Sequence, residues 1–438
     1  MYDRTYKRYM LAILLVILAS SYMDRYALGL VLQDIKAEFH TTDTQLGLLT
    51  GIAFAIFYSL MGIPIARWAD RGNRAHIISI TIFLWSIAVI MSGWVVNFAQ
   101  LLLVRIIVAI GEAGCLPPAH SLLADTFERE ERPRAVATYM LGSSLSVGVG
   151  YLLAGWLNDL YGWRATFRIL GVPGAVLSVL AWLTLREPRR RMRSLQHLGQ
   201  ARVALFEVSK ALWNNRTFRH LLFCFSIASF FGYGILQWLP AFFMRSYGFQ
   251  TQELGAWFTL VYGVGGFLGT FLGGQWAARY AAGNEQLQLK VMAAGYSSFG
   301  LISVFIYLSP NRYVSLALLG LATLGSATTT GPMFATIQTL VPERMRATSI
   351  AVIYLVANLI GMGLGPLVAG ALSDALQPSF GKESLRYALL ALCPGYLWVG
   401  WHVWRASTTV ARDIAAAQNS PHPHWHPRDA DPVTNHGH

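Results

Sequence analysis

The chain has 438 residues, of which 54% are hydrophobic and only 13% are charged. A soluble protein of this length would carry about twice that share of charged residues, so the composition excludes an ordinary soluble multidomain protein. The formal net charge of +12 does not indicate a nucleic-acid partner, because the basic residues gather in a few loops between apolar stretches.

Twelve apolar stretches approach the roughly 20 residues that a bilayer crossing needs. They lie near residues 9–32, 45–66, 75–96, 99–121, 136–158, 165–185, 219–242, 254–277, 289–309, 312–336, 347–372 and 385–406. Lys and Arg concentrate before the first stretch, in ARWADRGNR after the second and in REPRRRMR after the sixth. The positive-inside rule makes that side cytoplasmic. We therefore expect a multi-pass protein of the cell inner (plasma) membrane with both termini in the cytoplasm.

The first stretch carries an acidic and a basic residue side by side, Asp24 and Arg25. A charge at the centre of a bilayer costs at least about 2.5–3.5 kcal/mol, so it persists mainly where it lines a cavity or meets a partner. The fourth stretch carries Arg105 and Glu112, about two helical turns apart. Counting along the two helices puts Asp24 and Arg105 at nearly the same depth, so we expect these two to pair.

These four ionisable residues predict a transport site. We expect Asp24 and Glu112 to be proton-coupling residues, because burial away from water disfavours the charged form of a carboxyl group. We expect Arg25 and Arg105 to bind an anionic headgroup through their planar donors. The alternative is that Asp24 and Arg105 form a purely structural ion pair. Further substrate contacts are expected from polar or amphipathic residues of other stretches: Tyr139, Gln237, Trp238, Tyr354 and Asn358.

Polar intervals predict how the chain is divided. Residues 1–185 would form one six-helix bundle and residues 219–406 a second, joined by a cytoplasmic linker at 186–218. Part of this linker could be an amphipathic surface helix, although a solvated linker explains it equally well. The Pro- and His-rich residues 407–438 are expected to be a disordered cytoplasmic tail.

The two halves resemble each other in sequence, which predicts pseudo-symmetric bundles. Arg134 and Arg346 follow similar segments at an offset of 212 residues, and Asp159 and Asp374 do so at an offset of 215 residues. Such parallel repeats place a substrate site at the interface between the halves.

The loop GIPIARWADRGNR resembles the signature between the second and third helices of the major facilitator superfamily, loosely GxLADRxGRR. Ala66 and Asn73 depart from the two glycines of that signature. The resemblance implies twelve transmembrane helices in two bundles. It also implies a conformational latch at the cytoplasmic helix ends, which we expect to consist of Asp70, Arg71, Arg74 and Arg134. A simpler interpretation is that the arginines are only positive-inside charge.

Within that superfamily the sequence is most similar to the Spinster family of sphingolipid and lysolipid transporters. The similarity rests on MDRY in the first stretch, DRGNR in the loop, the segment from Arg105 to GEAGCLPPA, GVGY in the fifth stretch, and Trp163 and Arg168. It implies proton-coupled, alternating-access transport of an amphipathic anion that resembles a lysolipid or sphingosine phosphate. The anion:cation symporter family, which also shows an intramembrane Asp-Arg pair and GEA, leaves a small organic or sugar-acid anion as the alternative.

Other classes of function find little support in the sequence. It contains no HExxH, phosphate-loop, dinucleotide-binding or GxSxG motif, so we expect no enzyme and no cofactor. Cys115, Cys224 and Cys393 lie in separate apolar stretches, which predicts neither a disulfide nor a metal site. The expected partners are the substrate, protons and the bilayer, and the expected state is a monomer.

Overall fold

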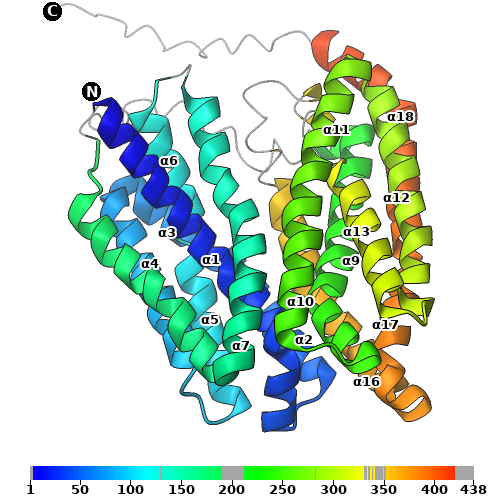
Figure 1. Ribbon diagram of the computed structural model, residues 1–438. Helices are drawn as coiled ribbons and strands as arrows, with labels where there is room; N and C mark the ends of the chain where they lie inside the picture. The colour runs from blue at the N-terminus through cyan, green and yellow to red at the C-terminus, as the bar shows by residue number, and fades with distance from the viewer. Residues whose placement is uncertain are drawn as a thin grey trace, which may run out of the picture.

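The computed structural model describes residues 3–128, 131–188, 212–281, 283–329, 333, 336–337, 339–340, 349 and 352–419. Over these ranges the regular structure is helical, with no strand. The predicted position Arg346 and the central part of the linker, residues 189–211, lie outside the described residues. Figure 1 shows two helical bundles side by side, one from each half of the chain.

The first bundle contains seven helices. They are α1 (Arg4–Phe39), α2 (Asp43–Thr50), α3 (Ile52–Arg71), α4 (Arg74–Ser92), α5 (Phe98–Glu112), α6 (Leu116–Thr126) and α7 (Arg132–Thr184). The chain reverses within α7 at Gly162, whose positive φ of 75° is readily adopted only by glycine. The two parts of α7 therefore make separate passes (Figure 1).

The second bundle contains α-helical, 3-10 and π-helical segments. They are α9 (Arg216–Tyr247), α10 (Thr251–Phe258), η2 (Thr259–Gly265), α11 (Gly266–Tyr280), α12 (Glu285–Leu308), α13 (Arg312–Ala327), η3 (Asn358–Leu364), α16 (Gly365–Phe380), η4 (Gly381–Glu383), α17 (Ser384–Leu392) and α18 (Gly395–Asn419). The segments η2 and η3 are π-helical, a form that is common at functional sites.

Asparagine begins many of these passes because its side chain accepts a hydrogen bond from a free backbone N–H of the first helical turn. Five helices have such a cap: Asn73 for α4, Asn97 for α5, Asn215 for α9, Asn284 for α12 and Asn311 for α13. At these five positions the asparagine fixes the residue at which the apolar helix begins.

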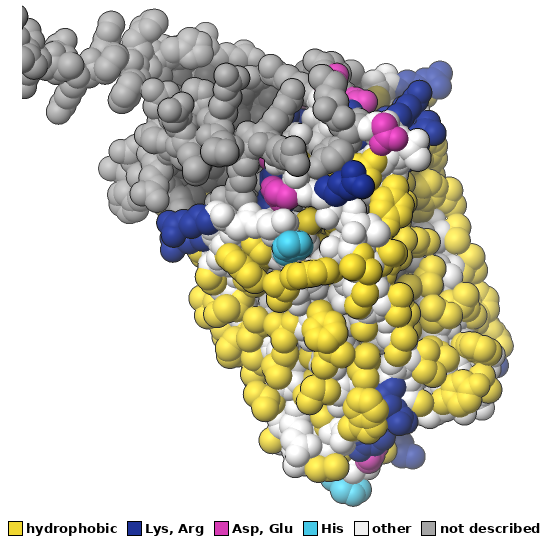
Figure 2. Space-filling view, turned by 90° about the vertical axis from the view of Figure 1, so that its left-hand side faces the viewer, with side chains coloured by type: hydrophobic (Ala, Val, Ile, Leu, Met, Phe, Trp, Pro, Cys, Tyr) yellow, Lys and Arg dark blue, Asp and Glu magenta, His cyan; other side chains and the backbone are white. Residues whose placement is uncertain are grey.

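The helices fit a membrane-spanning arrangement. Nine described segments are long and apolar enough to cross a bilayer. Two of them, Arg134–Thr184 and Val352–Ala416, are long enough for two passes each. Arg312–Ala327 is a shorter apolar helix. Figure 2 shows a broad hydrophobic surface, with charged side chains near its two ends. The predicted fold class, an all-α membrane protein of twelve helices in two bundles, is confirmed.

The last helix is longer than the sequence suggested. Helix α18 continues to Asn419, although we expected an unstructured tail from residue 407. Contacts with α9 explain the extension, because Asp413 accepts hydrogen bonds from the backbone N and the hydroxyl of Thr217 at 2.9 and 2.8 Å. Residues 420–438 lie outside the described part of the chain.

Helix α1 begins and α18 ends at the same end of the molecule, which we call the terminal end (Figure 1). At the opposite, distal end α2 packs on α16 and α10 packs on α7. Glycines permit close approach there: a Cβ added to Gly47 would lie 2.5 Å from the carbonyl oxygen of Pro366, and one added to Gly255 would lie 2.5 Å from that of Tyr151. The two bundles therefore meet backbone to backbone along this distal seam.

Candidate functional site

The four charged residues of the first and fourth predicted stretches form two ion pairs between α1 and α5. Arg105 donates from Nη1 to Asp24, which confirms the expected contact. Arg25 donates from Nε to Glu112 Oε2 at 2.9 Å and also from Nη2 to the same oxygen. The side chains of Asp24, Glu112 and Arg105 are almost completely buried, and that of Arg25 is 14% exposed. Each buried charge is thus compensated by an opposite charge on the neighbouring helix.

Aromatic rings surround the two guanidinium groups. The Phe54 centroid lies 4.5 Å from Cζ of both Arg25 and Arg105. Tyr22 and Tyr58 lie 4.5 and 5.1 Å from Cζ of Arg25. Such cation–π contacts contribute about 2 kcal/mol or more when they are desolvated. They add to the ion pairs in holding the two guanidinium groups in place.

The two ion pairs leave hydrogen-bonding capacity unused. Asp24 Oδ1, Glu112 Oε1 and Arg105 Nε are buried and have no hydrogen-bond partner among the described residues. Arg25 also reaches the second bundle, because its Nη1 lies 3.8 Å from Sδ of Met362 in η3. Unpaired buried polar atoms are rare and often mark a site that binds a ligand or a proton.

A small pocket of about 50 Å³ lies between the bundles, and Arg25 and Arg105 both line it. The first bundle provides Tyr22, Arg25, Tyr26, Thr50, Phe54 and Arg105, and the second provides Tyr233, Leu236, Gln237, Met362 and Pro366. The pocket therefore lies at the interface of the two halves, where the repeats placed the expected site.

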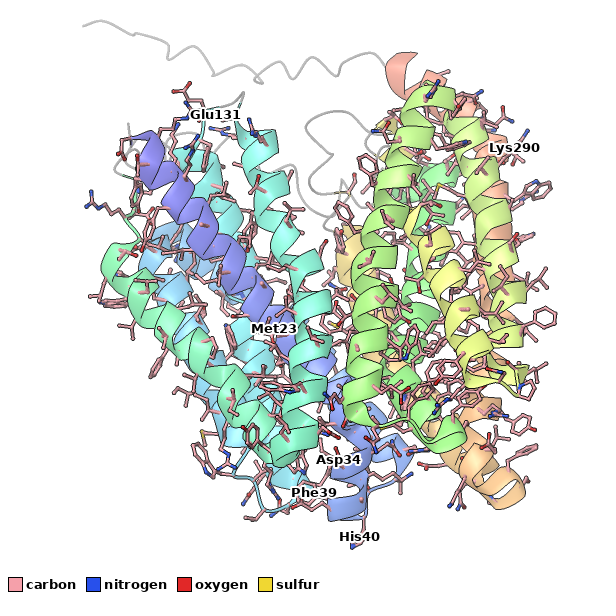
Figure 3. All side chains as sticks on the ribbon, viewed as in Figure 1. Met23, Asp34, Phe39, His40, Glu131 and Lys290 are labelled. Atoms are coloured by element: carbon pink, nitrogen blue, oxygen red, sulfur yellow. The ribbon has the colours of Figure 1, made fainter. Side chains whose placement is uncertain are left out.

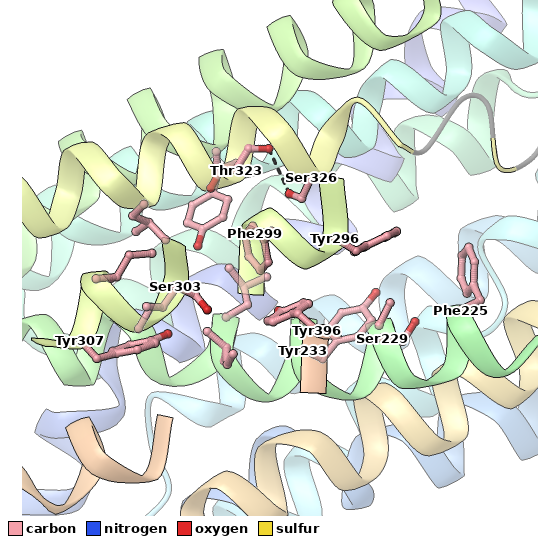
Figure 4. Close-up of a pocket in the computed structure, with 18 of the residues that line it drawn as sticks. Phe225, Ser229, Tyr233, Tyr296, Phe299, Ser303, Tyr307, Thr323, Ser326 and Tyr396 are labelled. Atoms are coloured by element: carbon pink, nitrogen blue, oxygen red, sulfur yellow. Dashed lines mark hydrogen bonds between the residues drawn. The ribbon is translucent and has the colours of Figure 1, made fainter. Parts of the chain in front are cut away.

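A larger cavity of about 410 Å³ adjoins this pocket, and Tyr26, Tyr233 and Leu236 line both. Most of its wall belongs to α9, α12 and α13 of the second bundle. Figure 4 shows aromatic rings and small hydroxyl side chains facing a common space. The labelled residues are Phe225, Ser229, Tyr233, Tyr296, Phe299, Ser303, Tyr307, Thr323, Ser326 and Tyr396. A compact charged pocket thus continues into a wide, mainly apolar cavity.

The other predicted substrate contacts are dispersed. Gln237 lines the arginine pocket. Tyr354 is half-exposed and packs edge-on against Phe225, a residue of the larger cavity, with ring centroids 5.7 Å apart. Asn358 begins the π-helical segment η3.

Two of the predicted contacts are core residues. Tyr139 is fully buried and packs edge-on against His120. Trp238 is fully buried and donates to the carbonyl oxygen of Pro366 at 2.9 Å. Neither of them lines the two cavities described above. The aromatic residues of α3, Phe54 and Tyr58, were missed, although their spacing of one helical turn was visible in the second stretch.

A polar network joins the bundles across the distal seam and was also missed. Arg245 of α9 donates from its two Nη atoms to the two carboxylate oxygens of Asp43, each at 2.6 Å, and from Nε to Gln33 at 2.7 Å. Asp43 also accepts from Lys36 at 2.5 Å and from Ser373 at 2.7 Å. Asp43 precedes one apolar stretch and Arg245 follows another, so only the fold brings them together.

Asp374 of α16 completes this network by capping α2. Its carboxylate accepts from the backbone N of Asp43 at 3.0 Å and from the backbone N and hydroxyl of Thr44 at 2.7 and 2.6 Å. A carboxylate from the second bundle thus satisfies the free N–H groups of a helix in the first.

A second polar contact crosses the seam nearby. Asn158 of α7 donates to Asp34 at 2.7 Å and to Thr251 of α10 at 3.2 Å. Figure 3 places Asp34 between the bundles near the distal end, whereas Glu131 lies at the terminal end. Lys7 donates to Glu131 there at 2.6 Å, within the first bundle.

The predicted latch residues differ in their surroundings. Arg74 is buried at the start of α4 and binds Glu187 at 2.6 Å, Asp125 at 2.7 Å and the Ser121 carbonyl at 2.9 Å. Arg71 is exposed.

Arg134 is also exposed, at the start of α7, and the side chain of Asp70 lies outside the described part of the structure. The acceptors of Arg74 named above lie in α6 and just after the end of α7, so in this conformation these ion pairs fasten helix ends within the first half of the chain.

Known proteins similar to this chain are membrane transporters of one superfamily. The family model described as Major Facilitator Superfamily matches residues 14–366. An "MFS-type efflux pump" of Mycolicibacterium smegmatis is 31% identical over 90% of this chain and 91% of its own. "Protein spinster homolog 1" of Xenopus tropicalis is 28% identical over 84% of this chain and 74% of its own.

A solved structure is also similar. It is the crystal structure of a bacterial homologue of the human lysosomal transporter Spinster in an inward-facing and unoccupied conformation, with a TM-score of 0.83 and 28% identity. The match covers 94% of this chain and 99% of that one.

Proposed function

Because this chain belongs to the major facilitator superfamily and is related to the Spinster proteins, we propose that it transports an amphipathic anion by proton-coupled alternating access. The substrate class is a lysolipid or a molecule similar to sphingosine phosphate. One observation carries the proposal: two buried arginines face a small pocket that continues into a large, mainly apolar cavity.

The shapes of the two spaces match the two parts of such a substrate. A phosphate or carboxylate accepts bidentate hydrogen bonds from guanidinium groups, and Arg25 and Arg105 both line the pocket. The apolar chain would occupy the adjoining cavity, where burial contributes about 0.8 kcal/mol for each CH₂ group. Tyr26, Tyr233 and Leu236, which line both spaces, would contact the junction between headgroup and chain.

The ion pairs provide a physical basis for proton coupling. An anionic headgroup that binds Arg25 competes with Glu112 for the same N–H donors. Glu112, left in a buried site without its cation, then binds a proton more readily. Asp24 and Arg105 form the second such pair. Linkage requires the converse as well, so a proton on Glu112 frees Arg25 for the substrate.

The closed distal seam supports an inward-facing conformation. With the termini in the cytoplasm, as the positive-inside charge indicates, the distal end faces the outside of an inner membrane. The site would then open toward the cytoplasm, as in the inward-facing relative. Opening the seam and closing the terminal end, where Arg71, Arg74 and Arg134 lie, would give the outward-facing state.

Uptake by purified protein in liposomes tests the proposal. We expect uptake of a fluorescent lysophospholipid that increases when a pH gradient is imposed. The variant Glu112→Gln should lose this stimulation and retain exchange of substrate across the membrane, because glutamine is neutral and cannot release a proton. Glu253→Gln, in the first turn of α10, serves as the matched control. Full stimulation in Glu112→Gln would remove Glu112 from the mechanism, and failure to move any lysolipid would exclude the substrate class.

A small organic anion is the second candidate substrate. The arginine pocket alone, at about 50 Å³, is large enough for little more than a carboxylate group and a few neighbouring atoms. Uptake of soluble sugar acids without any uptake of lysolipid would favour this class.

A further inference from the structure

An exposed surface of the second bundle combines arginines and tryptophans beside a histidine pair. It lies where α9 and α18 pack together near the terminal end, away from the cavities described above. Nδ1 of His220 in α9 lies 3.1 Å from Nδ1 of His402 in α18, so one ring donates to the other. Thr217 and Thr409, whose hydroxyls are 2.7 Å apart, connect the same helices closer to the terminal end. These contacts fix the two helices in register.

Large aromatic side chains project from this surface. Trp213, Phe223, Trp398 and Trp401 are 50%, 41%, 55% and 49% exposed. The Trp401 ring centroid lies 4.7 Å from that of His402, and the Phe223 centroid lies 5.5 Å from it. Tryptophan is enriched at the boundary between headgroups and hydrocarbon, so this aromatic group marks the depth of the headgroups.

The charges at that depth are predominantly positive. Arg219 lies one residue before His220 and Arg405 one turn after His402, and both act electrostatically on His220. Arg216 and Arg412 extend the basic group toward the terminal end. The carboxylate of Asp413 lies nearby, but it already accepts from Thr217 and from Arg412 at 3.1 Å. In the described part of the chain, Arg219 and Arg405 have no carboxylate partner.

We propose that this surface, formed by Arg219, His220 and Arg405 above the buried His402, binds the headgroup of an anionic phospholipid of the adjacent leaflet. The two arginines would flank the phosphate, and the acyl chains would lie along Phe223 and Trp398. Charge complementarity selects this occupant: two uncompensated guanidinium groups stand at headgroup depth beside an exposed apolar surface. A zwitterionic lipid would gain less, because its own cation would oppose the arginines. The site is independent of the transport cavity and of the proposed substrate.

Binding of phosphatidylglycerol to the full-length purified protein tests this site. Titration followed by native mass spectrometry would compare phosphatidylglycerol with phosphatidylcholine. We expect the double variant Arg219→Gln/Arg405→Gln to weaken phosphatidylglycerol binding about 25-fold, since each arginine near an anionic surface contributes about fivefold. Phosphatidylcholine binding should not change. Glycerol phosphate at millimolar concentration should not compete, because a headgroup without acyl chains lacks the apolar contacts.

The control is Arg279→Gln at the end of α11. Arg279 stands 5.5 Å from the exposed ring of Tyr280, as Arg219 stands 5.9 Å from that of Trp213, but Arg279 has no histidine pair beside it. We expect Arg279→Gln to weaken binding less than twofold. Equal losses of affinity in the control and in the double variant would mean that positive charge anywhere on the protein attracts the lipid, and would overturn the proposal. Unchanged binding in the double variant would overturn it as well.

Two further measurements keep the test decisive if the double variant folds poorly. The charge-conserving variant Arg219→Lys/Arg405→Lys should keep most of the affinity. A photoreactive phosphatidylglycerol should label the α18 peptide that contains Trp398 and Arg405 in the unmodified protein. Labelling confined to other helices would contradict the assignment.

Discussion

Arg245 of α9 binds both carboxylate oxygens of Asp43 at the start of α2, with two nitrogen–oxygen distances of 2.6 Å, and so joins the two bundles at the distal end. The Asp43 side chain is 2% exposed and that of Arg245 is 14% exposed, so water screens the pair weakly. Any conformation that opens the distal seam has to break this contact. The pair therefore contributes directly to the balance between the two states of the transporter.

The variant Asp43→Asn should shift that balance toward a distally open state. Breaking one partner of a buried pair costs about 3–5 kcal/mol, because it leaves Arg245 and Lys36 without their carboxylate. Double electron–electron resonance between spin labels at Ala37 and Gln377, which are exposed near the distal end, should report longer distances. The control is Arg386→Gln, since Arg386 pairs with Glu383 inside the second bundle. An unchanged distance distribution in Asp43→Asn would contradict a role of the pair in closing the seam.

Replacing Gly255 by valine should open the same seam by steric means. A Cβ at this position would lie 2.5 Å from the backbone oxygen of Tyr151, so α10 and α7 would have to separate. The same spin-label distances would lengthen, with no change of charge. Gly274→Val is the matched control in α11, since a Cβ there meets no atom within 4 Å. The prediction is wrong if both valine variants behave alike.

The variant Arg25→Lys should weaken substrate binding although it keeps the positive charge. Lysine cannot donate from Nε and Nη2 in one plane to Glu112, and it loses part of the contacts with Phe54, Tyr22 and Tyr58. We expect a loss of affinity of about tenfold, which corresponds to roughly 1.4 kcal/mol. Equilibrium binding to detergent-purified protein would measure it, with thermal unfolding as a check of folding. Affinity equal to that of the unmodified protein would mean that Arg25 contributes only its charge.

Arg74 and Arg71 of the loop after α3 should differ strongly in their effect on stability. Arg74→Gln leaves the partly buried acceptors of Glu187 and Ser121 without the donor of a buried arginine, which should cost about 1–3 kcal/mol and lower the midpoint of thermal unfolding. Arg71→Gln removes an exposed charge and should change stability by less than about 0.5 kcal/mol. Differential scanning fluorimetry of the two variants in the same detergent would test the difference. Equal midpoints would show that the Arg74 contacts do not stabilise the bundle.

Much of the architecture could be read from the amino-acid sequence because its signals are local. Apolar stretches of bilayer length, basic loops and repeated segments predicted twelve helices in two bundles. Asp24, Arg25, Arg105 and Glu112 were identifiable because charge in a hydrophobic helix is costly and needs a reason. Depth along the helices was enough to pair Asp24 with Arg105, since a helix rises by a constant distance per residue.

Only the tertiary structure decided which residues complete the site. Phe54 contacts both guanidinium groups because α3 packs beside α5 and the side chain of Arg25 reaches Phe54 from α1. A periodic apolar pattern does not distinguish that face of α3 from one in contact with lipid. Asp43 is 202 residues from Arg245 and 331 from Asp374 in the sequence. The three meet because the bundles close on each other at the distal end. Tyr139 and Trp238 were expected near the substrate, but packing places them in the core. Charge buried in a helix is thus visible in the sequence, whereas the aromatic and polar residues that surround it depend on how the helices pack.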